Sequence, residues 1–209
     1  MNRLPGFVRQ HLAALRGVLV FTVITGIIYP VAMWGLAQGL FHHSANGSLV
    51  SYKGRTVGSS LLCQEFVDAK GNPLVQYFQP RPSAATSGAS TDYGCNPLYS
   101  AASNLGPTNP KLIGLIRQRQ AAIAKFDHVS VSQIPPDAVT ASGSGLDPDI
   151  SPAYAAIQVD RVAAARHISP AQVRALVSEN TTGRTIGILG QPTVNVLTLN
   201  IALDNKYPV

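Results

Sequence analysis

The hydrophobic pattern of the chain is dominated by one uncharged segment near its N-terminus. Gly17–Phe41 is predominantly apolar, spans 25 residues and ends in the bulky pair Leu40–Phe41. As a helix rising about 1.5 Å per residue it extends roughly 37 Å, enough to cross a hydrocarbon core of about 30 Å. A core helix of this length would carry a polar face, and a signal peptide has a shorter apolar region before small residues. The pattern therefore predicts a retained transmembrane helix over residues 17–41.

Four small or polar positions and one proline inside this segment favour packing against a helix of another subunit. Gly35 and Gly39 form a GxxxG spacing that lets two helix backbones approach closely, and Gln38 adds a polar side chain between them. Pro30 removes a backbone donor, so a carbonyl must find another partner within the membrane. With Gly26, these residues are the predicted partner-helix contacts. The alternative is a lipid-facing helix in which the glycines are incidental.

After the anchor, short apolar runs alternate with turn-forming residues. Ser48–Tyr52 and Arg55–Gly58 flank Lys53–Gly54 and predict a β-hairpin. Leu61–Val67 and Leu74–Phe78 are further strand candidates. These segments indicate a domain that contains β-structure immediately beyond the membrane.

Later segments predict helices more clearly than strands. From Phe78 to Asn109 the chain is rich in Ser, Ala, Gly, Asn and Pro, which indicates a long, ordered surface loop. Capping residues followed by proline then open three predicted helices, at residues 110–126, 152–166 and 170–179. The last two are close enough to form a helical hairpin.

The C-terminal segments complete a mixed pattern. Arg184–Leu189 predicts a strand, whereas Val194–Leu203 is compatible with either a strand or a helix. The predicted fold class is α+β, with one N-terminal transmembrane helix followed by a single mixed α+β extracytoplasmic domain.

Charge predicts the orientation of the anchor. Residues 1–16 carry three arginines and no acidic residue, whereas His42–Tyr52 contains no lysine or arginine. By the positive-inside rule, residues 1–16 form a cytoplasmic basic tail next to anionic lipid, and residues 42–209 a periplasmic domain. The formal charge is +6, half of it in the tail, and no lysine- or arginine-rich run favours a nucleic-acid partner.

The remaining candidate chemistry is sparse. Cys63 and Cys95 both fall in the outer domain, where a disulfide is permitted, but the sequence leaves the pairing open, and their spacing does not suit a metal. Ser142–Gly145 suggests a hydrolase, yet residue 142 is Ser, so Gly-x-Ser-x-Gly is not formed around Ser144. No set of nucleophile, base and oxyanion donors is found, so the chain is predicted not to be an enzyme. A tethered hydrolase using residues 142–149 is the weaker alternative.

Several short stretches, in order along nearly the whole chain, carry a resemblance. They are Thr25-Gly26, Tyr29-Pro30, Ala45–Leu49, Tyr77-Phe78, Arg81–Ala84, Ser103–Pro110, Pro136–Asp147, Ile150–Pro152, Gln158, Arg161–Ala163, Ala165-Arg166, Gly190–Pro192, Val194-Asn195 and Leu199-Asn200 to Asp204. Together they resemble the KdpC family, the small subunit of the bacterial Kdp potassium-transporting P-type ATPase.

The resemblance implies a single-pass, non-catalytic subunit of the bacterial inner membrane. Its implied partners are a potassium-channel-like subunit, a P-type ATPase subunit and a very small helical subunit. The implied roles are assembly of the pump and a catalytic-chaperone role that raises ATP affinity. ATP and potassium are thus implied for the complex, while no cofactor and no nucleotide-binding residue is assigned to this chain. ATP is cytoplasmic, whereas only about 16 residues of this chain are, so assembly and pore contact are favoured.

One further expectation depends on the order of charges. Lys111–Lys125 is basic, and Phe126–Asp160 then contains five aspartates and no lysine or arginine. The resemblance places the outer domain over the entrance of a potassium pore, where an acidic face would raise the local cation concentration. The alternative is a pair of solvated faces whose charges segregate by chance. The predicted pore-entrance or partner-facing residues are Asp137, Asp147, Asp149 and Asp160.

A different class of function also remains open. The chain could be a membrane-tethered periplasmic binding module or chaperone that acts alone.

Overall fold

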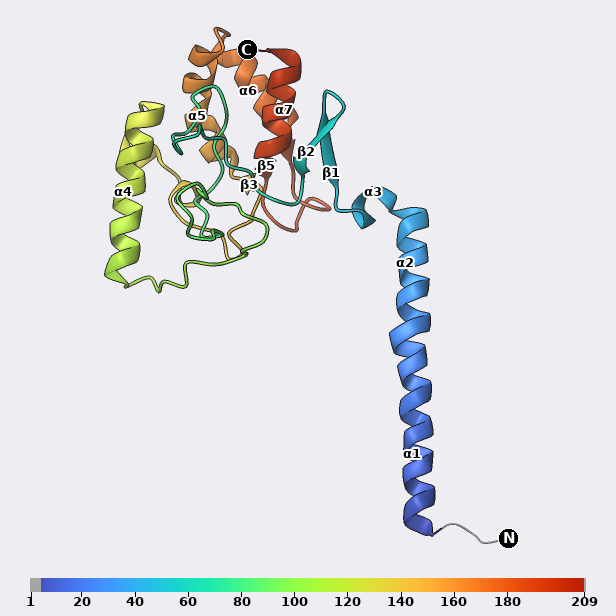
Figure 1. The fold of residues 1–209 in the computed structure, drawn as a ribbon. Helices are drawn as coiled ribbons and strands as arrows, with labels where there is room; N and C mark the ends of the chain where they lie inside the picture. Colours follow the sequence, from blue (N-terminus) through green and yellow to red (C-terminus); the bar gives the residue numbers. More distant parts are fainter. Residues whose placement is uncertain (1–4, 209) are drawn as a thin grey trace. The chain divides into compact units, whose positions relative to one another are not determined.

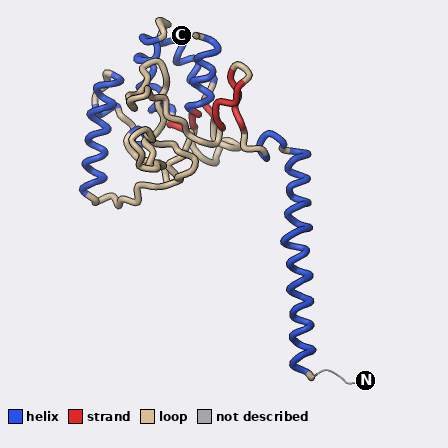
Figure 2. Tube along the Cα trace, viewed as in Figure 1, coloured by secondary structure: helices blue, strands red, loops and turns tan. Residues whose placement is uncertain are grey.

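The computed structural model describes residues 5–208, so Arg3 of the predicted basic tail lies outside the described residues. The chain divides into two compact units, Met1–Ser48 and Leu49–Val209. Figure 1 labels their helices and strands, and Figure 2 separates helix, strand and loop by colour.

The first unit is one long helix followed by a short one. Gly6–Leu40 is a continuous helix of 35 residues, long and apolar enough to cross a membrane, and none of the residues in its most apolar window is buried. It consists of α1 (Gly6–Val23), a π-helical segment (Ile24–Ile28) and α2 (Tyr29–Leu40), and α3 (His42–Ala45) follows. The predicted helix is therefore present, but it begins at Gly6 because the arginine-bearing residues before position 17 continue it.

The second unit opens with the predicted hairpin. β1 (Leu49–Tyr52) pairs antiparallel with β2 (Arg55–Ser59). Lys53 and Gly54 link the strands with φ angles of 48° and 77°. Positive φ at both central residues is the requirement of a type I′ turn, which matches the twist of paired strands.

The three helices opened by a cap and a proline are confirmed. They are α4 (Pro110–Asp127), α5 (Pro152–Ala165) and α6 (Pro170–Glu179). Each N-cap side chain accepts a hydrogen bond from a backbone N–H in the first turn, as Asn109 does from Lys111. Such a bond satisfies one of the donors that a helix start leaves unpaired.

The undecided C-terminal segment turns out to contain both a strand and a helix. A three-stranded antiparallel sheet runs in the order β3 (Asp149–Ile150), β5 (Thr193–Asn195) and β4 (Thr181–Thr182). Directly after β5 the chain becomes α7 (Val196–Lys206), whose N-cap is Asn195. The change occurs at Asn195 because its side chain accepts from the Thr198 N–H.

The predicted strand Arg184–Leu189 is wrong. Among the described residues this segment forms only a single bridge, Thr185 to Leu189. Ile186 and Gly187 both have positive φ, at 50° and 80°, so the chain folds back on itself within five residues instead of extending.

The strand predictions for Leu61–Val67 and Leu74–Phe78 are also wrong. The first segment makes one isolated bridge, from Val67 to Pro73. In the second, the backbone groups are bonded by buried side chains, as when the Phe78 N–H donates to Asn200 Oδ1 at 2.9 Å. Because side chains satisfy this backbone, the segment needs no neighbouring strand.

The core of the second unit lies among α5, α6, α7 and the small sheet. Val159, Val173 and Leu199 from these helices are 1%, 0% and 0% exposed. Phe78, which belongs to the irregular segment, is also fully buried in this core. Two short 3₁₀ turns, Val131–Gln133 and Pro136–Ala138, lie between α4 and β3 along the chain. The loop that the composition predicted from Phe78 to Asn109 has no helix or strand.

Candidate functional site

The backbone of the anchor changes its hydrogen-bond pattern just before Pro30. Pro30 has no N–H, and its ring would meet the carbonyl of Gly26 in a regular α-helix. Ile24–Ile28 instead form a π-helical turn, in which the Tyr29 N–H donates to the Ile24 carbonyl. The wider turn accommodates the proline ring, and single π turns of this kind are frequent at functional sites.

The glycines of the anchor present an open face. A Cβ atom placed on Gly26, Gly35 or Gly39 would meet no other atom within 4 Å in the described part of the chain. The neighbouring Trp34 and Leu36 are 66% and 56% exposed. These three glycine positions are therefore not covered by any other segment that the structure describes, and their role in partner-helix packing remains a proposal.

Gln38 behaves differently from the glycines. Its Oε1 accepts from Asn46 Nδ2 at 3.0 Å and lies 3.1 Å from His42 Nδ1. Asn46 Nδ2 also lies 2.7 Å from the His42 carbonyl, to which it donates. Gln38, His42 and Asn46 thus form a local polar cluster at the C-terminal end of the long helix. The side chain of Gln38 has its partners within its own chain, and Gly35 and Gly39 provide the open surface.

Two of the four predicted acidic residues hold the fold together. Asp137 accepts from the Ser151 N–H at 2.8 Å and the Ser151 hydroxyl at 2.9 Å, which fixes the start of α5. Asp147 forms an ion pair with Arg81 at 2.8 Å, and its side chain is 33% exposed. The charge of Asp147 is therefore balanced by an arginine that lies 66 residues earlier in the chain.

The other two differ in exposure. Asp149 accepts from Asn195 Nδ2 at 3.2 Å, so it ties β3 to β5. Asp160, on α5, is 76% exposed and lies 3.7 Å from the exposed Arg174. Of the four predicted pore-entrance or partner-facing residues, only Asp160 has a side chain that faces mainly solvent. Asp147 and Asp149 are neighbours, since the Asp149 N–H donates to Asp147 Oδ1 at 3.0 Å, and a role of the four residues at a pore entrance or partner surface remains a proposal.

Buried polar side chains, which the sequence did not single out as a group, hold the irregular segment 75–79. Arg161 on α5 donates through Nη1 to the carbonyls of Val75 and Tyr77, at 2.6 and 2.9 Å. Its Nε donates to Asp127 at 2.7 Å, and its Nη2 to Gln158 at 2.8 Å. Arg161 thus links α4, α5 and this segment through one guanidinium group.

Arg166 repeats this arrangement at the end of α5. Its Nε donates to the Gln76 carbonyl at 2.8 Å, and its Nη2 to Asp204 of α7 at 2.7 Å. Asn200 of α7 exchanges two hydrogen bonds with the backbone of Phe78. Arg161, Arg166 and Asn200 belong to the stretches that carried the family resemblance. Their structural role is to hold this segment against α5 and α7.

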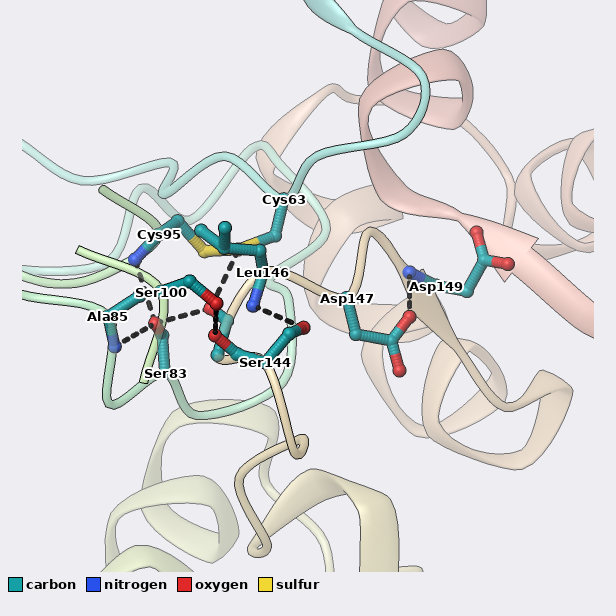
Figure 3. The surroundings of a disulfide bond; sticks show 10 residues. Cys63, Ser83, Ala85, Cys95, Ser100, Ser144, Leu146, Asp147 and Asp149 are labelled. Carbon is teal, nitrogen blue, oxygen red and sulfur yellow. Dashed lines mark hydrogen bonds between the residues drawn. A yellow bond between two sulfur atoms is a disulfide. The ribbon is translucent and has the colours of Figure 1, made fainter. Parts of the chain in front are cut away.

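The two cysteines form a disulfide that closes the irregular region. Cys63 and Cys95 are bonded, with 5.4 Å between their Cα atoms (Figure 3). The Cys63 N–H donates to the Leu146 carbonyl, and the Ser83 hydroxyl, which accepts from the Cys95 N–H, donates to the Gly145 carbonyl. The pairing that the sequence left open is thus present.

The Ser142–Gly145 motif is part of this closed region. Gly145 has a φ of 70°, and a Cβ there would lie 2.5 Å from the Ala101 carbonyl oxygen. The Ser144 hydroxyl accepts from the Leu146 N–H at 3.0 Å, as Figure 3 shows. Ser144 and Gly145 therefore have a structural explanation: they form a turn that lies against the disulfide.

These features place the chain in the class of proteins with one candidate membrane-spanning helix ahead of a mixed helix-and-strand domain. A model of the family described as "K+-transporting ATPase, c chain" matches residues 11–205. A protein named "Potassium-transporting ATPase KdpC subunit" from Streptomyces avermitilis is 46% identical, over 97% of this chain and 96% of its own length. Proteins of the same name from Kineococcus radiotolerans and Mycobacterium tuberculosis are 46% and 47% identical. They cover 98% and 94% of this chain, and 98% of their own length in both cases. The chain belongs to the KdpC family.

Proposed function

We propose that this chain is a non-catalytic subunit that assembles and stabilises a potassium-transporting ATPase. Family membership makes it a component of a potassium uptake complex. The proposed partners are a channel-like potassium subunit, a P-type ATPase subunit and a very small helical subunit. In this proposal, the ATPase subunit carries out the catalytic step, the hydrolysis of ATP.

One observation carries this proposal. The helix Gly6–Leu40 is long, apolar and unburied, and Gly35 and Gly39 leave its backbone open over one GxxxG spacing. Lipid tails give no hydrophobic driving force for helix association, so close backbone contact at small residues is the main means of packing. An anchor of this kind is suited to bind the transmembrane helix of a larger subunit.

The proposed topology places residues 1–16 in the cytoplasm and residues 42–209 outside the bacterial inner membrane. The arginines before the apolar segment support this orientation. The disulfide between Cys63 and Cys95 supports it as well, because such bonds persist in oxidising compartments. In this orientation, any effect on the ATP affinity of the pump passes through the anchor, since the outer domain does not reach the nucleotide.

The alternative is a membrane-tethered module that binds a ligand or acts as a chaperone alone. A tagged full-length chain, purified from its own bacterium in mild detergent, separates the two functions. Mass spectrometry should identify the potassium-channel-like and ATPase subunits in amounts comparable to the tagged chain. Recovery of the folded chain alone, from cells that make the other subunits, would favour the tethered module.

A further inference from the structure

A cavity of about 390 Å³ opens in the second unit between α4, α5 and the irregular segments that precede α4. Small-molecule sites usually measure about 300–1,000 Å³, so the cavity is large enough for a small organic ligand. Its apolar walls include Val67, Tyr93, Ile123 and Phe126. None of these residues belongs to the anchor or to the four aspartates predicted to face the pore entrance or a partner.

Glu65 is the first polar group of this cavity. Its carboxyl group has no hydrogen-bond or ion-pair partner among the residues that the structure describes. Burial raises the pKa of Glu65 from 4.5 to about 7, because water is withdrawn from the charged form and no neighbour replaces it. The chain's other glutamate, Glu179, is 59% exposed and lies 3.5 Å from Lys206. Glu65 is thus a carboxyl group that burial holds partly protonated near neutral pH and that a cationic partner would stabilise in its charged form.

Two arginines line the same cavity, and Arg119 is the one that can offer a donor to a ligand. Arg119 of α4 donates to the Val139 carbonyl at 2.8 Å and has no carboxylate partner among the described residues. Its pKa is lowered because its guanidinium is partly buried. Arg81 bonds Asp147 through Nη1 and the Thr140 carbonyl through Nη2, and its Nε, which has no partner within the described part of the chain, is covered by the chain itself. Buried donors of this kind cost stability unless an acceptor meets them.

The walls and the charges together define a ligand class. We propose that the cavity binds a small zwitterion with an apolar side group, of the amino-acid type. Its carboxylate accepts from Arg119, its ammonium group binds Glu65, and its apolar part lies against Tyr93 and Phe126. A simple anion would leave Glu65 without a partner, and a simple cation would leave Arg119 without a carboxylate partner. A bare potassium ion would require a cage of oxygen ligands, which these apolar walls do not supply.

Binding should depend on pH through Glu65. Glu65, Arg81, Tyr93, Arg119, Asp127 and Tyr154 are the titratable groups that line the cavity. Asp127 is already paired with Arg161, and burial raises the pKa of Tyr154 far above neutrality. Glu65 is therefore the group whose charge changes near neutral pH. An ammonium ligand selects the carboxylate form, so affinity should rise between about pH 6 and pH 8 and then level off.

The test uses the full-length chain in mild detergent, titrated with L-leucine, L-methionine and L-phenylalanine and followed by calorimetry. Phenethylamine and 3-phenylpropionate serve as probes that each retain one of the two charged groups of phenylalanine. At least one amino acid should bind saturably at millimolar concentration or below. For phenylalanine, loss of either charge should weaken binding at least about tenfold. No saturable binding by any of the three amino acids would overturn the proposal. So would an affinity for either singly charged probe that equals the affinity for phenylalanine.

Variants locate the binding to this cavity. Glu65→Gln and Arg119→Gln should each weaken amino-acid binding at least about tenfold, and Glu65→Gln should also abolish its pH dependence. Arg119→Lys keeps the charge and should retain part of the affinity, which guards against a folding defect in Arg119→Gln. The matched controls are Glu179→Gln and Arg117→Gln, two exposed charges outside the cavity. Unchanged affinity in Glu65→Gln and Arg119→Gln would overturn the proposed site.

Discussion

Asp127, the last residue of α4, and Arg161, in the middle of α5, form a buried ion pair. Their charged atoms lie 2.7 Å apart, and their side chains are 3% and 4% exposed. Arg161 also lies over the ring of Phe126, with its Cζ 4.3 Å from the ring centre. The pair therefore fixes α4 against α5 at the point where segment 75–79 is bonded.

Breaking this pair should cost more than breaking an exposed one. Asp127→Asn leaves the Arg161 charge buried without its counter-charge, so unfolding should become easier by about 3–5 kcal/mol. Urea denaturation of the full-length chain in mild detergent, followed by pulse proteolysis, measures this change. Asp160→Asn on α5 is the matched control, because its ion pair with Arg174 is exposed and should be worth about 1 kcal/mol or less. Equal effects for the two variants would contradict the structural role of the buried pair.

The disulfide should stabilise the second unit. Cys63 and Cys95 are separated by 32 positions, and closing a loop of that size contributes about 2–4 kcal/mol by restricting the unfolded chain. Cys63→Ser with Cys95→Ser should lower the unfolding free energy by that amount, measured by the same denaturation. Reduction of the native chain with dithiothreitol should reproduce the loss, and the double variant should not respond to the reductant. A native chain equally stable with and without reductant would contradict this prediction.

Glu65 should make stability depend on pH. Its pKa is about 7 in the folded chain against an ordinary value of 4.5, so the folded state keeps a proton that the unfolded state releases. Glu65 therefore reduces stability as pH rises from 4.5 to about 7. Glu65→Gln should match the native chain near pH 4.5 and exceed its unfolding free energy by about 2–3 kcal/mol above pH 7. Glu179→Gln is the control, and a gain for Glu65→Gln that is the same at every pH would show that ionisation of the buried carboxyl group is not its cause.

The proposed acidic approach to the pore can be tested at its exposed member. Asp160→Asn should weaken the apparent potassium affinity of the intact pump by about twofold at low ionic strength, because one steering charge is lost. Added inert salt should remove the difference by screening. Asp147→Asn instead leaves Arg81 without its carboxylate, so its main effect should be on stability. An Asp160→Asn defect of equal size at all salt concentrations would point to a lost contact and not to steering.

Local signals account for the parts of the fold that the sequence predicts well. The anchor follows from an uncharged run, the helices α4, α5 and α6 from caps and prolines, and the hairpin from Lys53–Gly54. These signals act within a few residues, so a single sequence carries them. Gln38, His42 and Asn46 recur every four residues, and that spacing could have revealed their cluster in advance.

Contacts between distant residues explain what the sequence does not predict. Segment 74–78 has an apolar pattern typical of a strand, but Asn200, 122 residues after Phe78, supplies hydrogen bonds in place of a neighbouring strand. Asp147 belongs to a stretch without basic residues, yet Arg81 reaches it from 66 positions away. That Glu65 and Arg119 line one cavity likewise becomes visible only in the fold, because they lie far apart in the sequence.

The central claim is that the anchor binds a partner subunit through its glycines, and co-purification of the pump tests it most directly. Gly35→Leu with Gly39→Leu fills the open face, whereas Gly17→Leu adds the same side chain at another open position of the helix. With the tag on the channel-like subunit, recovery of the double variant should fall about tenfold, which corresponds to roughly 1.4 kcal/mol. Recovery of Gly17→Leu should stay near that of the native chain, and all three chains should be equally abundant in the membrane. Full recovery of the double variant would contradict the claim.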